Sequence, residues 1–143
     1  MRSDFVEPRY EDLALANLLP SVMAVLDGTV PVIGLPRASK YVVLLVDGLG
    51  WHQLLEHADH ADTMAGLTRG SSRLTCSVPS TTATSLTSLG CGVPTGEHGI
   101  TGYTFFEPTV SRVINALTWE GGPEDLGTFA QTPTLFQRLA TSG

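Results

Sequence analysis

The chain of 143 residues has little of several features that mark large functional classes. It has only 8 Lys and Arg against 14 Asp and Glu, and none of the cations is clustered. This balance argues against a nucleic-acid polymer or an anionic membrane as the main partner. The two cysteines, Cys76 and Cys91, are too few for a disulfide framework or a zinc knuckle, and we expect both to be small packing or loop residues.

Long apolar segments are also missing. The run Tyr41–Val46 has the length of a buried strand, and no segment approaches the length that spans a bilayer. The N-terminal residues carry acidic side chains and a proline where a signal peptide needs a basic start and an apolar run. We therefore expect a soluble, cytoplasmic protein.

What is present indicates one globular domain, with 42% apolar and 15% charged residues. Leucines and valines recur at helical spacing from Arg9 to Asp27, and Pro20 predicts either a kink or two short helices that meet there. Residues 1–40 are interpreted as a helical lead-in and residues 41–143 as the main domain. Its elements are a helix over 51–67, strands at 73–78, 103–106 and 112–119, and a helix that begins at Thr132-Pro133-Thr134.

The apolar run Tyr41–Val46 predicts a central strand covered on both faces, and it ends at Asp47-Gly48. In open α/β sheets, ligands bind beyond the carboxyl ends of the strands. Asp47 is thus a candidate functional carboxylate. An Asp before a Gly also commonly caps a helix or forms a turn, and the local sequence does not decide between the two.

A second candidate region is the stretch from Ser77 to Ile100, which is rich in Ser, Thr and Gly. Its composition suits the presentation of a hydroxyl rather than a packed core. A hydroxyl is a poor nucleophile at neutral pH unless a base or a metal activates it, and no G-x-S-x-G elbow is present. Metal activation by a strand-end carboxylate would favour an anionic substrate with a transferable phosphoryl group.

Another metal interpretation rests on His52, Glu56 and His60, which would share one face of a helix over 51–67. A solvated helix surface is the commoner explanation of such a pattern, and a tetrahedral zinc ion would still need a further ligand.

Four elements in order resemble one known family. They are Val46-Asp47-Gly48, then Pro79-Ser80-Thr81-Thr82, then Gly92, and finally Pro94 through His98-Gly99. This order is similar to that of the type I phosphodiesterases and nucleotide pyrophosphatases of the alkaline phosphatase superfamily. The resemblance runs from about Tyr41 to Gly143.

The resemblance implies an α/β fold with a central, largely parallel sheet flanked by helices, and a hydrolase with two divalent metal ions, usually zinc. Thr82 would be the nucleophile and a metal ligand, and Asp47 would be a metal ligand. Gly48 and the amide of Thr82 would surround the substrate phosphate. Ser85 stands where many relatives have an Asn that holds a phosphoryl oxygen, and its hydroxyl could still donate a hydrogen bond. His98 matches a structural position.

The family's remaining Asp and His ligands come from a later part of a longer domain, so the resemblance implies an apparently truncated, N-terminal portion with an incomplete site. The expected partner is a small phosphorylated substrate, and the oligomeric state stays open. A monoesterase, sulfatase or phosphonate hydrolase of the same superfamily is one alternative, and a non-catalytic chain is another. A sulfatase-like reading would start from Ser77, but the Gly expected ten residues later is Thr87.

Overall fold

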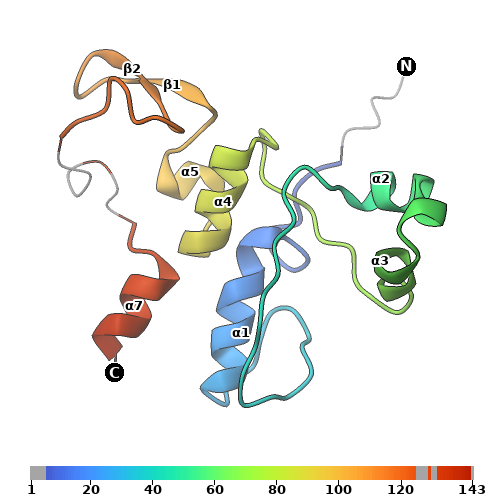
Figure 1. Ribbon diagram of the computed structural model, residues 1–143. Coiled ribbons are helices and arrows are strands. Elements are labelled where there is room, and N and C mark those ends of the chain that lie inside the picture. Colours follow the sequence, from blue (N-terminus) through green and yellow to red (C-terminus); the bar gives the residue numbers. More distant parts are fainter. Residues whose placement is uncertain (1–5, 125–128, 130–131, 143) are drawn as a thin grey trace.

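The computed structural model describes residues 6–124, 129 and 132–142 as a small α/β structure. Figure 1 shows a body of helices and a hairpin, and a lobe made by α2 and α3 beside it. The elements are η1 (Leu15–Asn17), α1 (Leu18–Leu26), α2 (Trp51–Glu56), η2 (Ala58–His60), α3 (Asp62–Leu67), α4 (Thr82–Cys91), α5 (Thr95–His98), β1 (Thr104–Glu107), β2 (Arg112–Asn115) and α7 (Leu135–Ser142).

Helix α4 is the centre of the body, and it packs against η1, α1, α5 and α7. Thr81 caps its N-terminus, because the Thr81 hydroxyl accepts the amide hydrogen of Thr84. Gly92 ends the helix in the left-handed conformation, with φ of 71°. The buried face of α4 consists of Leu89 and four small side chains, namely Ala83, Thr84, Ser88 and Cys91. Small side chains let the neighbouring elements approach closely.

The N-terminal segment forms two short helices, η1 and α1, which is close to the second expectation, although they meet at Leu18 rather than at Pro20. Pro20 lies in the first turn of α1, where its missing amide hydrogen has no helical partner to lose. Helical structure begins at Leu15, and the change from the 3-10 helix η1 to the α-helix α1 comes at Leu18, two residues before the proline.

Strands β1 and β2 form an antiparallel hairpin in which Phe105 pairs with Ile114. The Ile114 side chain is fully buried. These strands were expected from the sequence, although the second is shorter than the predicted 112–119.

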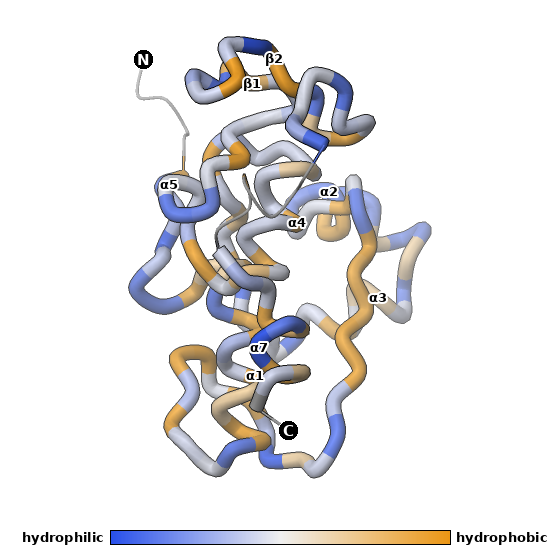
Figure 2. The backbone as a smooth tube through the Cα atoms, turned by 90° about the vertical axis from the view of Figure 1, so that its left-hand side faces the viewer, coloured by the Kyte–Doolittle hydropathy of each residue, from blue (hydrophilic) through white to orange (hydrophobic). Residues whose placement is uncertain are grey.

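The described residues do not contain the expected central parallel sheet. The run Tyr41–Val46 is extended but unpaired, with Val42 96% and Leu44 83% exposed. It is the apolar vertical segment beside α3 in Figure 2. Thr75 makes a single parallel bridge with Ala14, so the predicted strand at 73–78 is also extended without a ladder. The apolar composition of Tyr41–Val46 predicted a buried strand, but this run has no partner strand in the part of the chain that the structure describes.

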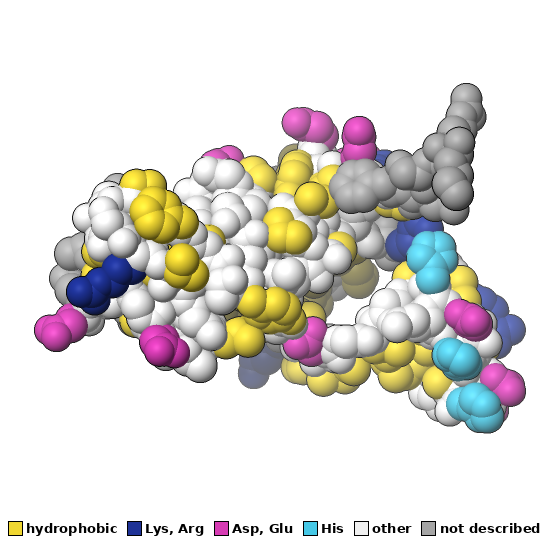
Figure 3. Space-filling view, turned by 90° about the horizontal axis from the view of Figure 1, so that it is seen from above, with side chains coloured by type: hydrophobic (Ala, Val, Ile, Leu, Met, Phe, Trp, Pro, Cys, Tyr) yellow, Lys and Arg dark blue, Asp and Glu magenta, His cyan; other side chains and the backbone are white. Residues whose placement is uncertain are grey.

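The expected helix over 51–67 is divided into α2, η2 and α3, and none of these three has a fully buried residue. Without a continuous buried stripe, little packing energy holds the segment in one long helix. Histidine side chains gather on this lobe, which a hollow separates from the body (Figure 3). Because the segment is broken, His60 is not in line with His52 and Glu56 on one helix face.

Helix α7 begins where the sequence predicted a helix, with a small difference in its capping. Thr134 is the cap, because its hydroxyl accepts the Gln137 amide hydrogen while the Gln137 side chain accepts the Thr134 amide hydrogen. Pro133 therefore precedes the cap instead of opening the first turn.

The conformation at the end of α4 leads to a first prediction. A Cβ atom at Gly92 would lie 2.7 Å from Pro20 Cγ and 3.3 Å from Leu135 Cδ1, in a backbone conformation that L-residues rarely adopt. We expect Gly92→Ala to lower the free energy of unfolding by about 1–3 kcal/mol. Urea denaturation monitored by circular dichroism measures the change.

Gly90→Ala is the matched control. Gly90 lies inside the same helix, and an added Cβ meets nothing within 4 Å. Its replacement should leave stability unchanged or raise it by up to about 1 kcal/mol. Equal effects of the two substitutions would contradict the proposed packing of α4 against Pro20 and Leu135.

Candidate active site

Asp47 and Thr82 are 35 residues apart in sequence and adjacent in space. The Thr82 hydroxyl donates a hydrogen bond to Asp47 Oδ2, with 3.2 Å between the oxygens. The second carboxylate oxygen, Asp47 Oδ1, accepts the Gly48 amide hydrogen at 2.8 Å. The structure thus joins the two residues that the sequence selected from separate motifs.

The local fold decides which threonine hydroxyl is available. Thr81 directs its hydroxyl to Thr84 Oγ1 at 2.9 Å while accepting the Thr84 amide, so it serves the helix cap. Thr82 is the first residue of α4, where backbone amides have no helical acceptor. A partial positive charge at this helix end favours a bound anion beside Thr82.

Gly48 and Ser85 are placed differently. Gly48 directly follows Asp47, has φ of 72°, and is exposed, although its amide is engaged by the Asp47 carboxylate. Ser85 lies nearly one turn into α4, and its hydroxyl oxygen is buried without a hydrogen-bond partner among the described residues. The structure therefore brings Gly48 to the Asp47–Thr82 pair and leaves the Ser85 hydroxyl away from solvent.

Tyr103 is a third residue at this site, and the sequence analysis missed it. Its phenol oxygen lies 3.0 Å from Thr82 Oγ1 and 3.5 Å from the Thr82 amide nitrogen. Tyr103 directly precedes the strand residues Thr104–Glu107, so the sequence predicted it to be part of a strand. Only the turn between α5 and β1 returns it to the start of α4.

Buried hydrogen bonds hold α4 in position behind the site. Ser77 donates to Ser88 Oγ at 2.7 Å, and His98 Nε2 lies 2.8 Å from Ser88 Oγ. His98 Nδ1 accepts the Ile100 amide hydrogen at 3.1 Å. The neutral ring therefore carries its proton on Nε2 and donates it to Ser88. Burial lowers the pKa of His98, which favours this neutral form.

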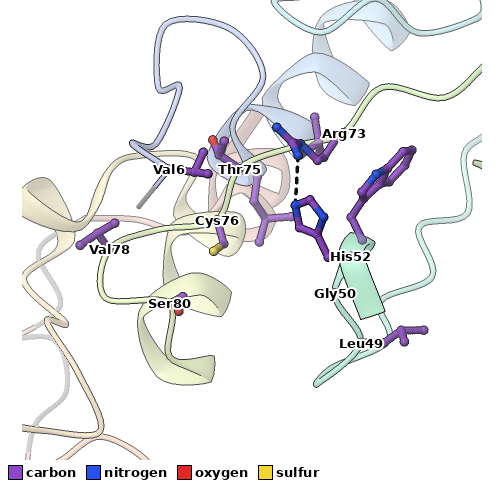
Figure 4. A pocket seen from close by; sticks show the side chains of 12 residues that line it. Val6, Leu49, Gly50, His52, Arg73, Thr75, Cys76, Val78 and Ser80 are labelled. Atoms are coloured by element: carbon purple, nitrogen blue, oxygen red, sulfur yellow. Dashed lines mark hydrogen bonds between the residues drawn. The ribbon is translucent and has the colours of Figure 1, made fainter. Parts of the chain in front are cut away.

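Two pockets flank the region. The first has a volume of about 540 Å³, includes Thr82, and is lined mainly by apolar side chains such as Leu86, Leu117 and Trp119. The second has a volume of about 520 Å³ and lies between α2 and the extended segment 73–80 (Figure 4). Arg73 and His52 are in contact at 3.1 Å in this second pocket. Asp47 lines neither pocket, and Thr82 lines only the first, so we assign the first pocket to the site on the position of Thr82.

The described residues contain no group of three or more His, Cys, Asp or Glu side chains that could hold a metal ion. The interpretation of His52, Glu56 and His60 as a metal site is therefore not supported. Asp47 and Thr82 together offer a carboxylate and a hydroxyl oxygen to a cation, which is part of a coordination shell.

A hydroxyl at a helix N-terminus that faces a carboxylate is suited to phosphoryl-transfer chemistry. Residues 41–140 match the family described as type I phosphodiesterase / nucleotide pyrophosphatase. The chain belongs to this family, a hydrolase family whose members are usually metal-dependent. The resemblance inferred from the sequence motifs is thereby confirmed.

Neither the curated proteins nor the solved structures gave a significant match to the chain. Within residues 6–124, 129 and 132–142, none of the helices combines the length and the apolar character that crossing a membrane requires.

The His98 network leads to a prediction of pH dependence. The pKa of His98 is lower in the folded chain than its ordinary value of about 6.5, so the unfolded chain binds a proton more readily. The stability from neutral His98 is fully present above about pH 6.5 and declines as the pH falls toward the folded-state pKa. Urea midpoints measured from about pH 8 to pH 5 should fall with pH, and less steeply in His98→Gln.

His60→Gln is the control for this measurement, because the His60 side chain is 80% exposed and lies outside the network. Its pH profile should follow that of the wild type. An equally steep decline in His98→Gln and the wild type would exclude His98 as the source.

Proposed function

We propose that the chain takes part in the hydrolysis of phosphate diesters or pyrophosphates, with Thr82 as the nucleophile and Asp47 as its partner. The observation that carries the proposal is the hydrogen bond from the Thr82 hydroxyl to Asp47 Oδ2 at the N-terminus of α4. It joins a nucleophilic atom, a carboxylate and a helix end that favours anions.

The proposed reaction has two steps. Thr82 Oγ1 attacks phosphorus and the bond from phosphorus to the leaving oxygen breaks, while the Thr82 proton passes to water and the leaving oxygen gains a proton from water. Water then attacks the phosphorus of the Thr82 adduct, the bond from phosphorus to Thr82 Oγ1 breaks, and a phosphate monoester is released as the Thr82 hydroxyl is restored. The Thr82 amide at the helix start has only a long contact of 3.5 Å with the Tyr103 phenol oxygen, and it can exchange this contact for a hydrogen bond to a non-bridging oxygen of the bound phosphate.

Asp47 and Thr82 fit part of a divalent-cation site, because both offer oxygen ligands and Asp47 is exposed. A bound cation would act as a Lewis acid that stabilises negative charge on the nucleophile and the phosphoryl group. The chain's own contribution is to hold the Asp47 carboxylate within 3.2 Å of the nucleophilic oxygen. Asp47 and Thr82 offer oxygen ligands, which do not select zinc over other divalent cations. The expectation of zinc therefore rests on the family resemblance alone.

The pocket that includes Thr82 favours a diester or a pyrophosphate over a monoester. Its volume of about 540 Å³ is in the range that accommodates a small organic group. Apolar lining by Leu117 and Trp119 suits a second substituent on phosphorus, which a monoester lacks. The sulfatase alternative is weakened further, because Ser77 is buried and donates to Ser88.

The first test of this function is Thr82→Ala, assayed with bis(p-nitrophenyl) phosphate and added divalent metal. Removal of the nucleophile should lower kcat by at least about a hundredfold. Ser80→Ala is the matched control, because Ser80 is an exposed hydroxyl residue two positions earlier. It should retain wild-type turnover.

Acid-quenched wild-type protein should also carry a phosphoryl adduct on the peptide that contains Thr82, as detected by mass spectrometry. Wild-type turnover in Thr82→Ala would exclude this mechanism. If neither the wild type nor Thr82→Ala hydrolysed the diester and the two did not differ in metal affinity, the non-catalytic alternative would be favoured.

A separate test concerns the cation. Asp47→Asn removes the negative charge while preserving the shape of the side chain, and we expect it to weaken Zn²⁺ or Mn²⁺ binding by about tenfold or more. Isothermal titration calorimetry measures the affinity without any substrate. Asp27→Asn, at the exposed end of α1, should bind metal as the wild type does. Equal affinities for all three proteins would remove Asp47 from the proposed metal site.

A further inference from the structure

The position of Tyr103 is fixed independently of its phenol. The Tyr103 carbonyl accepts the Ala116 amide hydrogen at 2.8 Å, next to the paired strands β1 and β2. The hairpin therefore anchors the backbone while the ring reaches to the start of α4. The residue is 43% exposed, so it does not serve as a core residue.

The direction of the hydrogen bonds follows from the number of protons. Thr82 has one hydroxyl proton and donates it to Asp47 Oδ2. The contact of 3.0 Å between the Tyr103 and Thr82 oxygens must then use the phenol proton, so Tyr103 donates to Thr82 Oγ1. The phenol oxygen in turn lies 3.5 Å from the Thr82 amide nitrogen and accepts its hydrogen. The result is a continuous chain from the Thr82 amide through Tyr103 and the Thr82 hydroxyl to Asp47.

We propose that Tyr103 is a functional residue that orients the Thr82 hydroxyl and stabilises the negative charge that develops on its oxygen. This inference rests on the proposed nucleophilic role of Thr82. A donor to a neutral hydroxyl contributes little, but the same donor interacts more strongly once the oxygen becomes negative. Tyr103 keeps its own proton throughout, and it therefore acts by hydrogen bonding rather than by proton transfer.

The arrangement also constrains the geometry of attack. The Asp47 carboxylate accepts the hydrogen bond from the Thr82 hydroxyl and Tyr103 donates to one lone pair of Thr82 Oγ1, which leaves the second lone pair for phosphorus. When the hydroxyl proton leaves, the lone pair that it frees would be available to a bound cation. The two hydrogen-bond partners restrict rotation of the Thr82 hydroxyl before the substrate binds. No free energy of reorganisation is then needed during the reaction, which is the advantage of a preorganised donor. Thr82 on its own would rotate between several positions at the exposed helix end.

Tyr103→Phe tests the inference, because it removes the phenol oxygen and keeps the ring. With bis(p-nitrophenyl) phosphate as the probe, we expect kcat to fall by about 10²–10³-fold, as for the loss of one preorganised donor, with a smaller change in KM. The unfolding midpoint should not change. Tyr41→Phe is the matched control, because it removes a phenol that bonds to the Pro36 carbonyl, and its kcat should equal that of the wild type.

A second readout does not depend on turnover. Orthovanadate, which forms an adduct with a nucleophilic hydroxyl, should bind more weakly to Tyr103→Phe than to the wild type in a fluorescence titration. In a Thr82→Ala background, adding Tyr103→Phe should change orthovanadate binding no further, because Tyr103 acts through Thr82. A purely structural role would give additive losses.

The outcomes separate the two proposals. If Tyr103→Phe matches Tyr41→Phe in kcat and orthovanadate binding while Thr82→Ala is inactive, the role of Tyr103 is overturned and Thr82 remains the nucleophile. If the wild type, supplied with divalent metal, neither hydrolyses the probe nor binds orthovanadate, both proposals are overturned.

Discussion

The buried hydrogen bonds of Ser88 are the constraint on which the rest of the site depends. Ser88 lies on the inner face of α4 and joins Ser77, before the helix, to His98, after it. A polar group in this position would destabilise the fold if it lacked partners, so the bonds define one orientation of the helix. Because Thr82 is the first residue of that helix, the same bonds decide where its hydroxyl points.

This constraint explains an unusual feature of the body, which is that polar residues make up much of its buried part. Ser77, Thr84, Ser88 and His98 are buried together with small apolar residues such as Ala83. A core of large aliphatic side chains would hold α4 by contact area alone and would tolerate small rotations. Directional hydrogen bonds, together with close contact between Gly92 and Pro20, tolerate less rotation, and an active-site helix benefits from that precision.

The sequence predicted part of this arrangement. The order and spacing of the motifs identified the family, and the match to these motifs selected Asp47 and Thr82, because such motifs are short and can be recognised without the fold. Tyr103 could not be predicted in the same way, since its contact with Thr82 depends on the turn after α5. The central sheet was implied by the family resemblance, and the apolar run Tyr41–Val46 predicted one of its strands; composition cannot tell whether a partner strand is present. The described residues provide none, and Val42 and Leu44 are exposed.

The unpaired segment has a consequence for the site itself. Asp47 follows Val46 directly, so no strand ladder fixes the backbone that carries the carboxylate. Within the described part of the chain, the Asp47 carboxylate bonds to the adjacent Gly48 amide and to the Thr82 hydroxyl, and the second bond reaches another element. Thr82, in contrast, belongs to a helix that is capped, terminated and bonded from within. The two halves of the site are therefore held in place differently. Helix α4 fixes the position of Thr82, whereas the Asp47 carboxylate is held near α4 by its hydrogen bond with the Thr82 hydroxyl. A cation shared by the two oxygens would strengthen the weaker half, which agrees with the metal dependence usual in the family.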